Sequence, residues 1–166
     1  MQEYNDYIIT TRRWLQYYNR FKAAIDCMVD DLKTIEEELE DGELAAPIAK
    51  YGDMPAGGNP ELNAVERATD RRIKLQSKRQ KVKSDIGELR RVTHRVDRAL
   101  NTLDEETKGI IKGRFIDGYS WEQVAIGCHM SESGTRKRGN RALSDLALVM
   151  FGVKVRPEQL SFVFFE

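Results

Sequence analysis

A strict alternation of four-residue and three-residue steps between apolar side chains constrains the first 41 residues more than any other feature. From Asp6 to Glu40 the chain contains neither glycine nor proline. The residues that follow this spacing are Trp14, Tyr18, Phe21, Ile25, Met28, Leu32, Ile35 and Leu39. An average step of about 3.5 residues is the repeat of a coiled-coil stripe. We therefore predict a long helix over residues 6–41 that packs through this stripe.

A second stripe with the same repeat lies between residues 60 and 103. Asn59 is a favourable N-cap and Pro60 suits the first helical position, so a helix is expected to begin here and reach residue 101. Its stripe comprises Val82, Ile86, Leu89, Thr93, Val96, Leu100 and Leu103. Gly42 should end the first helix, and residues 42–59, with four glycines and two prolines, form a loop. Residues 1–102 are thus predicted to form an antiparallel helical hairpin.

Charge is divided unevenly between these helices although the net charge of the chain is zero. Residues 1–41 hold five Lys or Arg against ten Asp or Glu, whereas residues 60–102 hold twelve against six. Such asymmetry is expected of helices that pair with each other or face different partners. The dense basic run over residues 71–83 is either a solvated face paired with the acidic helix or an additional contact to phosphate.

A single hairpin buries little apolar surface, so its stripes need further cover. We expect either the C-terminal part of the chain or a second copy to supply it. The sequence therefore favours a homo-oligomer, with a dimer as the preferred state, because coiled-coil stripes commonly pair two copies of a chain. The apolar tail, residues 153–166, either covers such a stripe or contacts a partner.

Residues 103–152 have the pattern of three shorter helices. Thr102 or Asp104 can cap the first, which runs through Phe115, and Ser120 can cap the second. Gln123 completes a capping box with Ser120. Ser131 begins the third helix, which should end before Gly152.

The two last helices are joined by a tight turn at His129 and Met130. The segment after the turn is basic at its start, with Arg136, Lys137, Arg138 and Arg141, and apolar at its end, with Ala142, Leu143 and Leu146. This arrangement is typical of a DNA-binding helix-turn-helix, whose second helix enters the major groove.

This part of the chain resembles region 4 of bacterial sigma factors. The shared residues are Leu103 to Glu106, Ile110, Ile111, Arg114, Phe115, Gly118, Ser120, Val124, Ala125, Ser131 and Arg141 to Leu143. Over its whole length, with a helical N-terminal half and the segment Tyr51 to Pro55, the chain is similar to phage transcriptional regulators of the ArpU/RinA type. The resemblance implies an all-α protein: a long coiled-coil-like hairpin followed by a sigma region 4-like helix-turn-helix domain over residues 103–152.

The sequence departs from the sigma-like pattern at three places. Gly134 and Thr135 replace a usual Thr-Val pair, so one buried anchor is missing or replaced. His129 stands where glycine often serves the turn, at some steric cost. Gly139 lies inside the last helix, where it should cost about 1 kcal/mol relative to Ala.

The helix-turn-helix reading assigns DNA contacts to individual residues. We expect Glu132, Ser133, Arg136 and Lys137 to contact bases. Arg136 is the first choice, because a guanidinium can bond both acceptors of guanine. Ser120, Arg138 and Arg141 are expected to contact phosphates. Alternatively, Arg138 and Arg141 pair with acids such as Asp145.

The sequence predicts no enzyme, metal site or cofactor. The two histidines, His94 and His129, lie in no motif that supplies a nucleophile, base or metal partner. Cys27 and Cys128 lack metal spacing and are expected to be free thiols. No signal peptide or apolar run long enough to span a membrane is visible, which favours the cytoplasm of a bacterium or phage-infected host.

These features predict a sequence-specific transcriptional regulator, by resemblance a phage or prophage activator of late genes. Its partner would be double-stranded DNA, and the resemblance to sigma region 4 implies contact with a promoter near the upstream element or with bacterial RNA polymerase. One alternative is a DNA-packaging protein like a terminase small subunit, although those usually place the DNA-binding part before the hairpin. Another is a sigma- or anti-sigma-like co-regulator that binds only protein.

Overall fold

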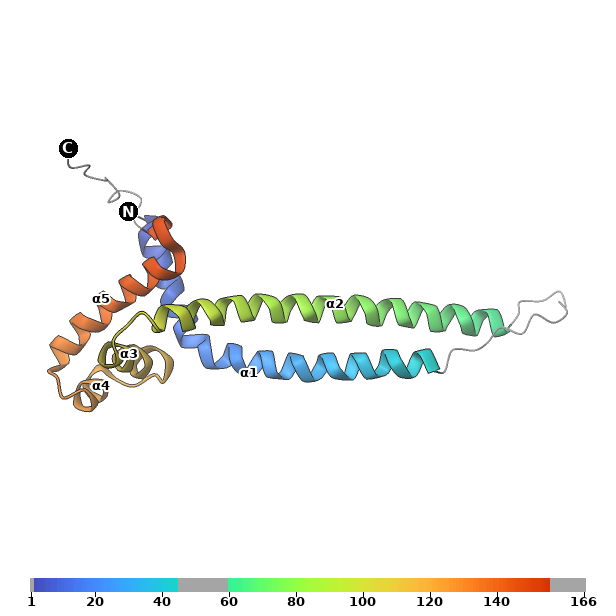
Figure 1. Ribbon diagram of the computed structural model, residues 1–166, viewed down its shortest axis with the longest axis horizontal. Coiled ribbons are helices and arrows are strands. Elements are labelled where there is room, and N and C mark those ends of the chain that lie inside the picture. The colour runs from blue at the N-terminus through green and yellow to red at the C-terminus, as the bar shows by residue number, and fades with distance from the viewer. Residues whose placement is uncertain (1, 45–59, 156–166) are drawn as a thin grey trace, which may run out of the picture. The chain divides into compact units, whose positions relative to one another are not determined.

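The computed structural model describes the backbone of residues 2–44 and 60–155 and the side chains of residues 6–42, 65–152 and 155. Its elements in chain order are the helices α1 (Gln2–Leu44), α2 (Pro60–Leu100) and α3 (Glu105–Ile111), the π-helical turn η1 (Lys112–Ile116), the helices α4 (Trp121–Gly127) and α5 (Glu132–Phe151), and the 3₁₀ turn η2 (Gly152–Val155) (Figure 1). Every element in this part of the chain is helical, which confirms the predicted all-α class.

The predicted ends of the two long helices differ from the observed ends by a few residues. The prediction that Gly42 ends the first helix is wrong, because α1 continues through Gly42 to Leu44. A glycine inside a helix costs about 1 kcal/mol, which lowers stability without forcing the helix to end. Most of the predicted loop and of the apolar tail lies in residues 45–59 and 156–166, outside the described residues.

The chain divides into two compact units, and the division cuts both long helices. One unit spans Ala24–Leu89, and the other combines the residues up to Ala23 with those from Arg90 onward. The boundary predicted from the sequence lies instead at residue 102, between the hairpin and the helix-turn-helix domain. The physical reason for the difference is that the start of α1 and the end of α2 share a core with the three shorter helices.

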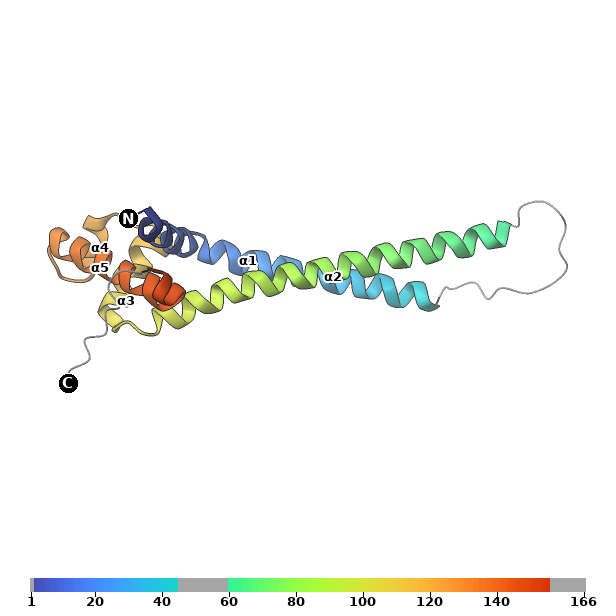
Figure 2. The same cartoon turned by 90° about the horizontal axis from the view of Figure 1, so that it is seen from above.

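In the Ala24–Leu89 unit, segments of α1 and α2 run antiparallel, side by side in Figure 1 and crossing each other in Figure 2. Stripe residues Ile25, Ile35, Leu39 and Ile86 are buried. Ion pairs flank the stripe: Lys83 Nζ lies 2.8 Å from Glu36 Oε1, and Arg71 lies 3.7 Å from Glu38. The hydrogen bond from Lys83 lowers the pKa of Glu36 below its usual range. Opposite charges on the two helices therefore meet, as the uneven charge distribution suggested.

The other unit has one apolar core to which five helices contribute. The start of α1 supplies Leu15 and Tyr18, and the end of α2 supplies Val96, Ala99 and Leu100. The three shorter elements complete it with Ile111, Phe115, Ala142, Leu143, Leu146 and Met150, while Trp121 of α4 packs against it. The last turn of α5 lies beside the start of α1, where the ring of Phe151 is 5.1 Å from that of Tyr7 and 5.2 Å from that of Trp14.

Candidate nucleic-acid interface

The helix α3 starts at a side-chain cap and ends in a π-helical turn. Asp104 Oδ1 accepts a 2.9 Å hydrogen bond from the backbone N–H of Thr107, as predicted for this cap. Gly113, in η1, allows close packing, because a Cβ there would lie 3.2 Å from Cγ2 of Val124. A Cβ on Gly109 would meet no atom within 4 Å, so only one of these two glycines permits a close helix contact.

The helix α4 and its turn form as the local sequence predicts. Ser120 Oγ accepts from the N–H of Gln123 at 3.2 Å, and Gln123 Oε1 accepts from the N–H of Ser120 at 2.8 Å, which completes the capping box. In the turn, His129 has φ 54°, and it is the one non-glycine residue of the described chain with a positive φ. A side chain in this conformation has a steric cost. The turn is therefore set by the surrounding structure rather than by a glycine.

The start of α5 is anchored by its cap and by Thr135. Ser131 Oγ accepts from the N–H of Gly134 at 3.2 Å. Thr135 is fully buried, and its hydroxyl donates to the carbonyl of Ser131 at 3.0 Å. Thr135 thus anchors the start of α5 in the core, and its hydroxyl is satisfied locally.

The four predicted base-contacting residues lie on the exposed first two turns of α5. Glu132, Ser133, Arg136 and Lys137 are all exposed. Their spacing of one and four residues places them on one side of the helix, while Thr135 and Gly139 face the core. Arg136 Nη2 donates to Glu132 Oε1 at 2.5 Å. The guanidinium is therefore held at the surface by an acid on the same helix.

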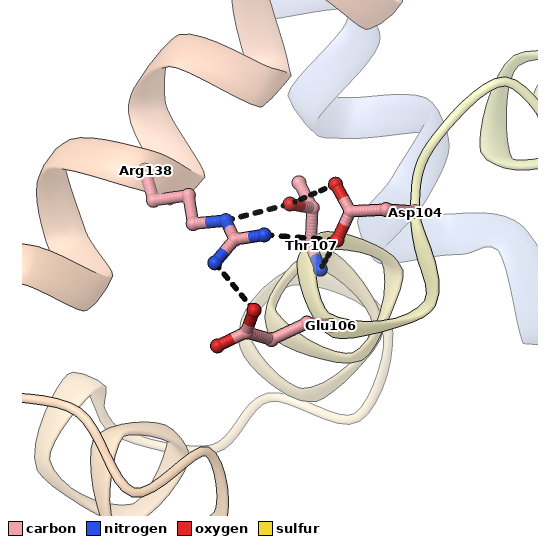
Figure 3. Close-up of polar contacts among 4 residues, drawn as sticks. All are labelled: Asp104, Glu106, Thr107 and Arg138. Atoms are coloured by element: carbon pink, nitrogen blue, oxygen red, sulfur yellow. Dashed lines mark hydrogen bonds and ion pairs between the residues drawn. The ribbon is translucent and has the colours of Figure 1, made fainter.

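The predicted phosphate contacts do not lie together. Ser120 is exposed at the start of α4, where its hydroxyl serves as the cap, and Arg141 is exposed on α5. Arg138 instead points toward α3 (Figure 3). Its Nε donates to Thr107 Oγ1 at 2.7 Å, its Nη1 to Glu106 at 2.6 Å and its Nη2 to Asp104 at 2.9 Å. These bonds favour the alternative in which Arg138 pairs with acids, although the acids belong to α3 and the loop before it rather than to Asp145.

A polar groove that was not predicted from the sequence lies among α1, η1, α4 and α5. It has a volume of about 320 Å³ and is lined by Arg12, Gln16, Arg114, Phe115, Gly118, Trp121 and Asn140. The sequence signal for Asn140 was its place one helical turn after Arg136. Arg12 carries no comparable signal, because it belongs to a helix more than 100 residues earlier in the chain.

No group of three or more His, Cys, Asp or Glu side chains in the described part of the chain is arranged to hold a metal ion. Cys27 is exposed, Cys128 is half-buried, and both are free thiols. Among the described helices, none has a stretch that is both long and apolar enough to cross a membrane.

Comparison of the chain with protein-family models, with curated proteins and with solved structures gave no match.

Proposed function

We propose that this protein is a sequence-specific, DNA-binding regulator of transcription that reads the major groove with the first half of α5. One observation carries the proposal. The helices α4 and α5 are both capped by serine and joined by a tight turn, and α5 buries one side while it exposes Glu132, Ser133, Arg136 and Lys137 on another. A helix held in this way can enter the major groove with polar side chains toward the bases.

The pair of Glu132 and Arg136 supports sequence-specific DNA binding rather than purely electrostatic binding. Free of DNA, Arg136 is satisfied by Glu132 at 2.5 Å. On DNA it exchanges this acid for the two acceptors of a guanine, and the freed Glu132 can accept from a cytosine amino group. Glu132 also repels phosphates. It therefore disfavours binding to sequences that offer Arg136 no guanine in place of this acid.

Further contacts in this proposal fix the register on the duplex. Ser120 and Arg141 bind phosphates, and Lys137 adds positive charge near the bases. The proposed regulator works as a homo-oligomer, preferably a dimer, at a promoter, with RNA polymerase as its second partner. Support for self-association comes from the α1 stripe, where Met28 and Leu32 remain half-buried within the Ala24–Leu89 unit. The phage or prophage origin rests on the resemblance alone.

The experiment begins with selection of short duplexes from a random-sequence pool by the wild-type protein. Affinity is then measured for the selected duplex and for a scrambled one, with wild type, Arg136→Ala and Arg141→Ala. Loss of a bidentate base contact removes about 1–3 kcal/mol of discrimination, or roughly five- to 150-fold. We expect Arg136→Ala to lose preference for the selected duplex, and Arg141→Ala to weaken binding to both duplexes equally.

Measurement of the mass of the protein and of its DNA complex separates the alternatives. A dimer on one discrete site supports regulation, whereas a ring-sized assembly favours DNA packaging. If no duplex is enriched and wild type shows no salt-dependent binding, α5 is not a DNA reader. The protein-binding alternative then takes its place.

A further inference from the structure

The groove beside α5 is formed by three separate parts of the chain. Arg12 and Gln16 lie one turn apart on α1, Arg114 and Phe115 belong to η1, and Asn140 belongs to α5. All of these parts lie in the same compact unit. Arg12, Gln16 and Asn140 are exposed, and no acidic residue is among the described residues that line the groove. The groove is therefore open to solvent and positively charged.

An aromatic pair holds the two arginines of this groove. The rings of Phe115 and Trp121 meet edge to face, with centroids 5.9 Å apart and planes at 87°. The guanidinium carbon of Arg12 lies 5.9 Å from the centroid of Phe115, and that of Arg114 lies 5.3 Å from the centroid of Trp121. Arg114 Nη1 also donates to the carbonyl of Tyr119 at 2.8 Å. Two like charges thus lie against one ring pair, and an anion bound between them would reduce their mutual repulsion.

The groove continues the proposed reading surface of α5. Asn140 lines it and lies four residues after Arg136, so the two side chains share a face of the helix. Gly118 and Trp121 on its rim flank Ser120, the proposed phosphate contact at the start of α4. A duplex whose bases meet Arg136 would therefore carry its backbone past this groove.

We infer that Arg12 of α1 binds a DNA backbone phosphate in this groove, together with Arg114, so that the reading surface extends beyond the helix-turn-helix onto the first helix. This inference rests on the proposed function. Guanidinium groups suit phosphate, because their fork of donors matches its oxygens. The contact fixes the angle at which α5 enters the groove and adds one charge to the salt dependence of binding.

The test measures affinity for the duplex selected by wild type over a range of salt concentrations. Each phosphate contact contributes about 0.9 to the slope of log affinity against log salt. Arg12→Ala should reduce the magnitude of the slope by about 0.9, so that over a fourfold rise in salt its affinity falls about 3.5-fold less than that of wild type. Arg12→Lys keeps the charge and should keep the slope. Arg13→Ala is the matched control, because Arg13 is exposed on the same helix but does not line the groove.

A second readout locates the contact. Ethylation of individual phosphates should reveal one position that interferes with wild type and Arg13→Ala but no longer with Arg12→Ala. A loss of folded protein that is equal at every salt concentration lowers the affinity by a constant factor, so a partial loss of stability of this kind in Arg12→Ala does not imitate a changed slope. If Arg12→Ala keeps the slope and the interference pattern of wild type while Arg136→Ala loses discrimination, this inference is overturned and the proposed function stands. If wild type does not bind DNA, both are overturned.

Discussion

The indole ring of Trp121 lies against the backbone of Gly139. A Cβ atom at residue 139 would stand 2.7 Å from Cη2 and 2.8 Å from Cζ3 of this ring, and 3.2 Å from Cγ2 of Ile110. Residue 139 is helical, so its glycine serves close approach rather than an unusual backbone conformation. The absence of a side chain here allows α3 and α4 to pack against α5. Helix propensity alone counts Gly139 as destabilising, whereas the packing of Trp121 favours a residue without a side chain at this position.

Gly139→Ala should lower the free energy of unfolding by up to about 2 kcal/mol. Overpacking costs about 1–3 kcal/mol, and the better helix propensity of alanine returns about 1 kcal/mol. Gly109→Ala is the control, because a Cβ there meets no atom within 4 Å. It should stabilise the protein by about 0.5–1 kcal/mol. Urea unfolding of Gly139→Ala and Gly109→Ala tests these two predictions. Equal stabilisation by both substitutions would mean that the indole of Trp121 moves aside at little cost.

Arg138→Ala should lower the midpoint of thermal unfolding more than Arg141→Ala does. Arg138 joins α5 to Glu106, Thr107 and Asp104 through three hydrogen bonds. Arg138→Lys should rescue little, because an ammonium group lacks the planar fork. On DNA, Arg141→Ala should reduce the salt slope by about 0.9, and Arg138→Ala should leave it unchanged. If Arg138→Ala reduced the salt slope and left the midpoint of thermal unfolding unchanged, Arg138 would instead be a phosphate contact.

Acid should weaken the fold partly through Asp104. The backbone N–H of Thr107, followed by its hydroxyl, lowers the pKa of this carboxyl below its usual range, and Arg138 acts in the same direction. A folded pKa below the unfolded one gives stability that is present above the unfolded value of about 4 and is lost as the pH falls through the folded pKa. Asp104→Asn keeps a capping oxygen but does not titrate. The stability difference between wild type and Asp104→Asn should therefore shrink toward zero in acid, and a constant difference would argue against this assignment.

Local features of the fold were predictable from sequence. Ser120 and Ser131 each cap a helix as predicted, and Asp104, one of the two candidates, caps α3, because a cap depends on residues within one turn. Much of the α2 stripe was also predictable, and Ile86, Thr93, Val96 and Leu100 are buried. Repeating apolar spacing fixes which side of a helix is buried even when the covering partner is unknown.

Features that depend on contacts between distant segments were not predictable. The predicted α1 stripe included Trp14, which is half-buried. The neighbouring Leu15 is the fully buried residue, with 1% of its surface exposed. The reason is that the start of α1 contacts α5 and α2 together, which requires a broader buried face than a two-helix stripe. For the same reason, the partners of Arg138 and the groove at Arg12 have no signal within a single stretch of sequence.

The start of α1 should be required for the shorter helices to fold. Leu15 packs in one core with Leu143 and Leu146. Leu15→Ala should therefore cost about 2–5 kcal/mol. In a Trp14→Phe background, Trp121 is the only remaining tryptophan and reports on α4 and α5. Its fluorescence should change at a lower denaturant concentration when Leu15→Ala is added.

Ile9→Ala is the control for this experiment, because Ile9 lies on the same helix with 46% of its surface exposed. It should change the free energy of unfolding by about 0.5 kcal/mol or less. If Leu15→Ala left the Trp121 transition where it was, residues 103–152 would fold independently of α1. A shift of the transition by Leu15→Ala but not by Ile9→Ala would instead make the first helix part of the proposed DNA-binding unit. That outcome is also the structural condition for Arg12 to reach DNA.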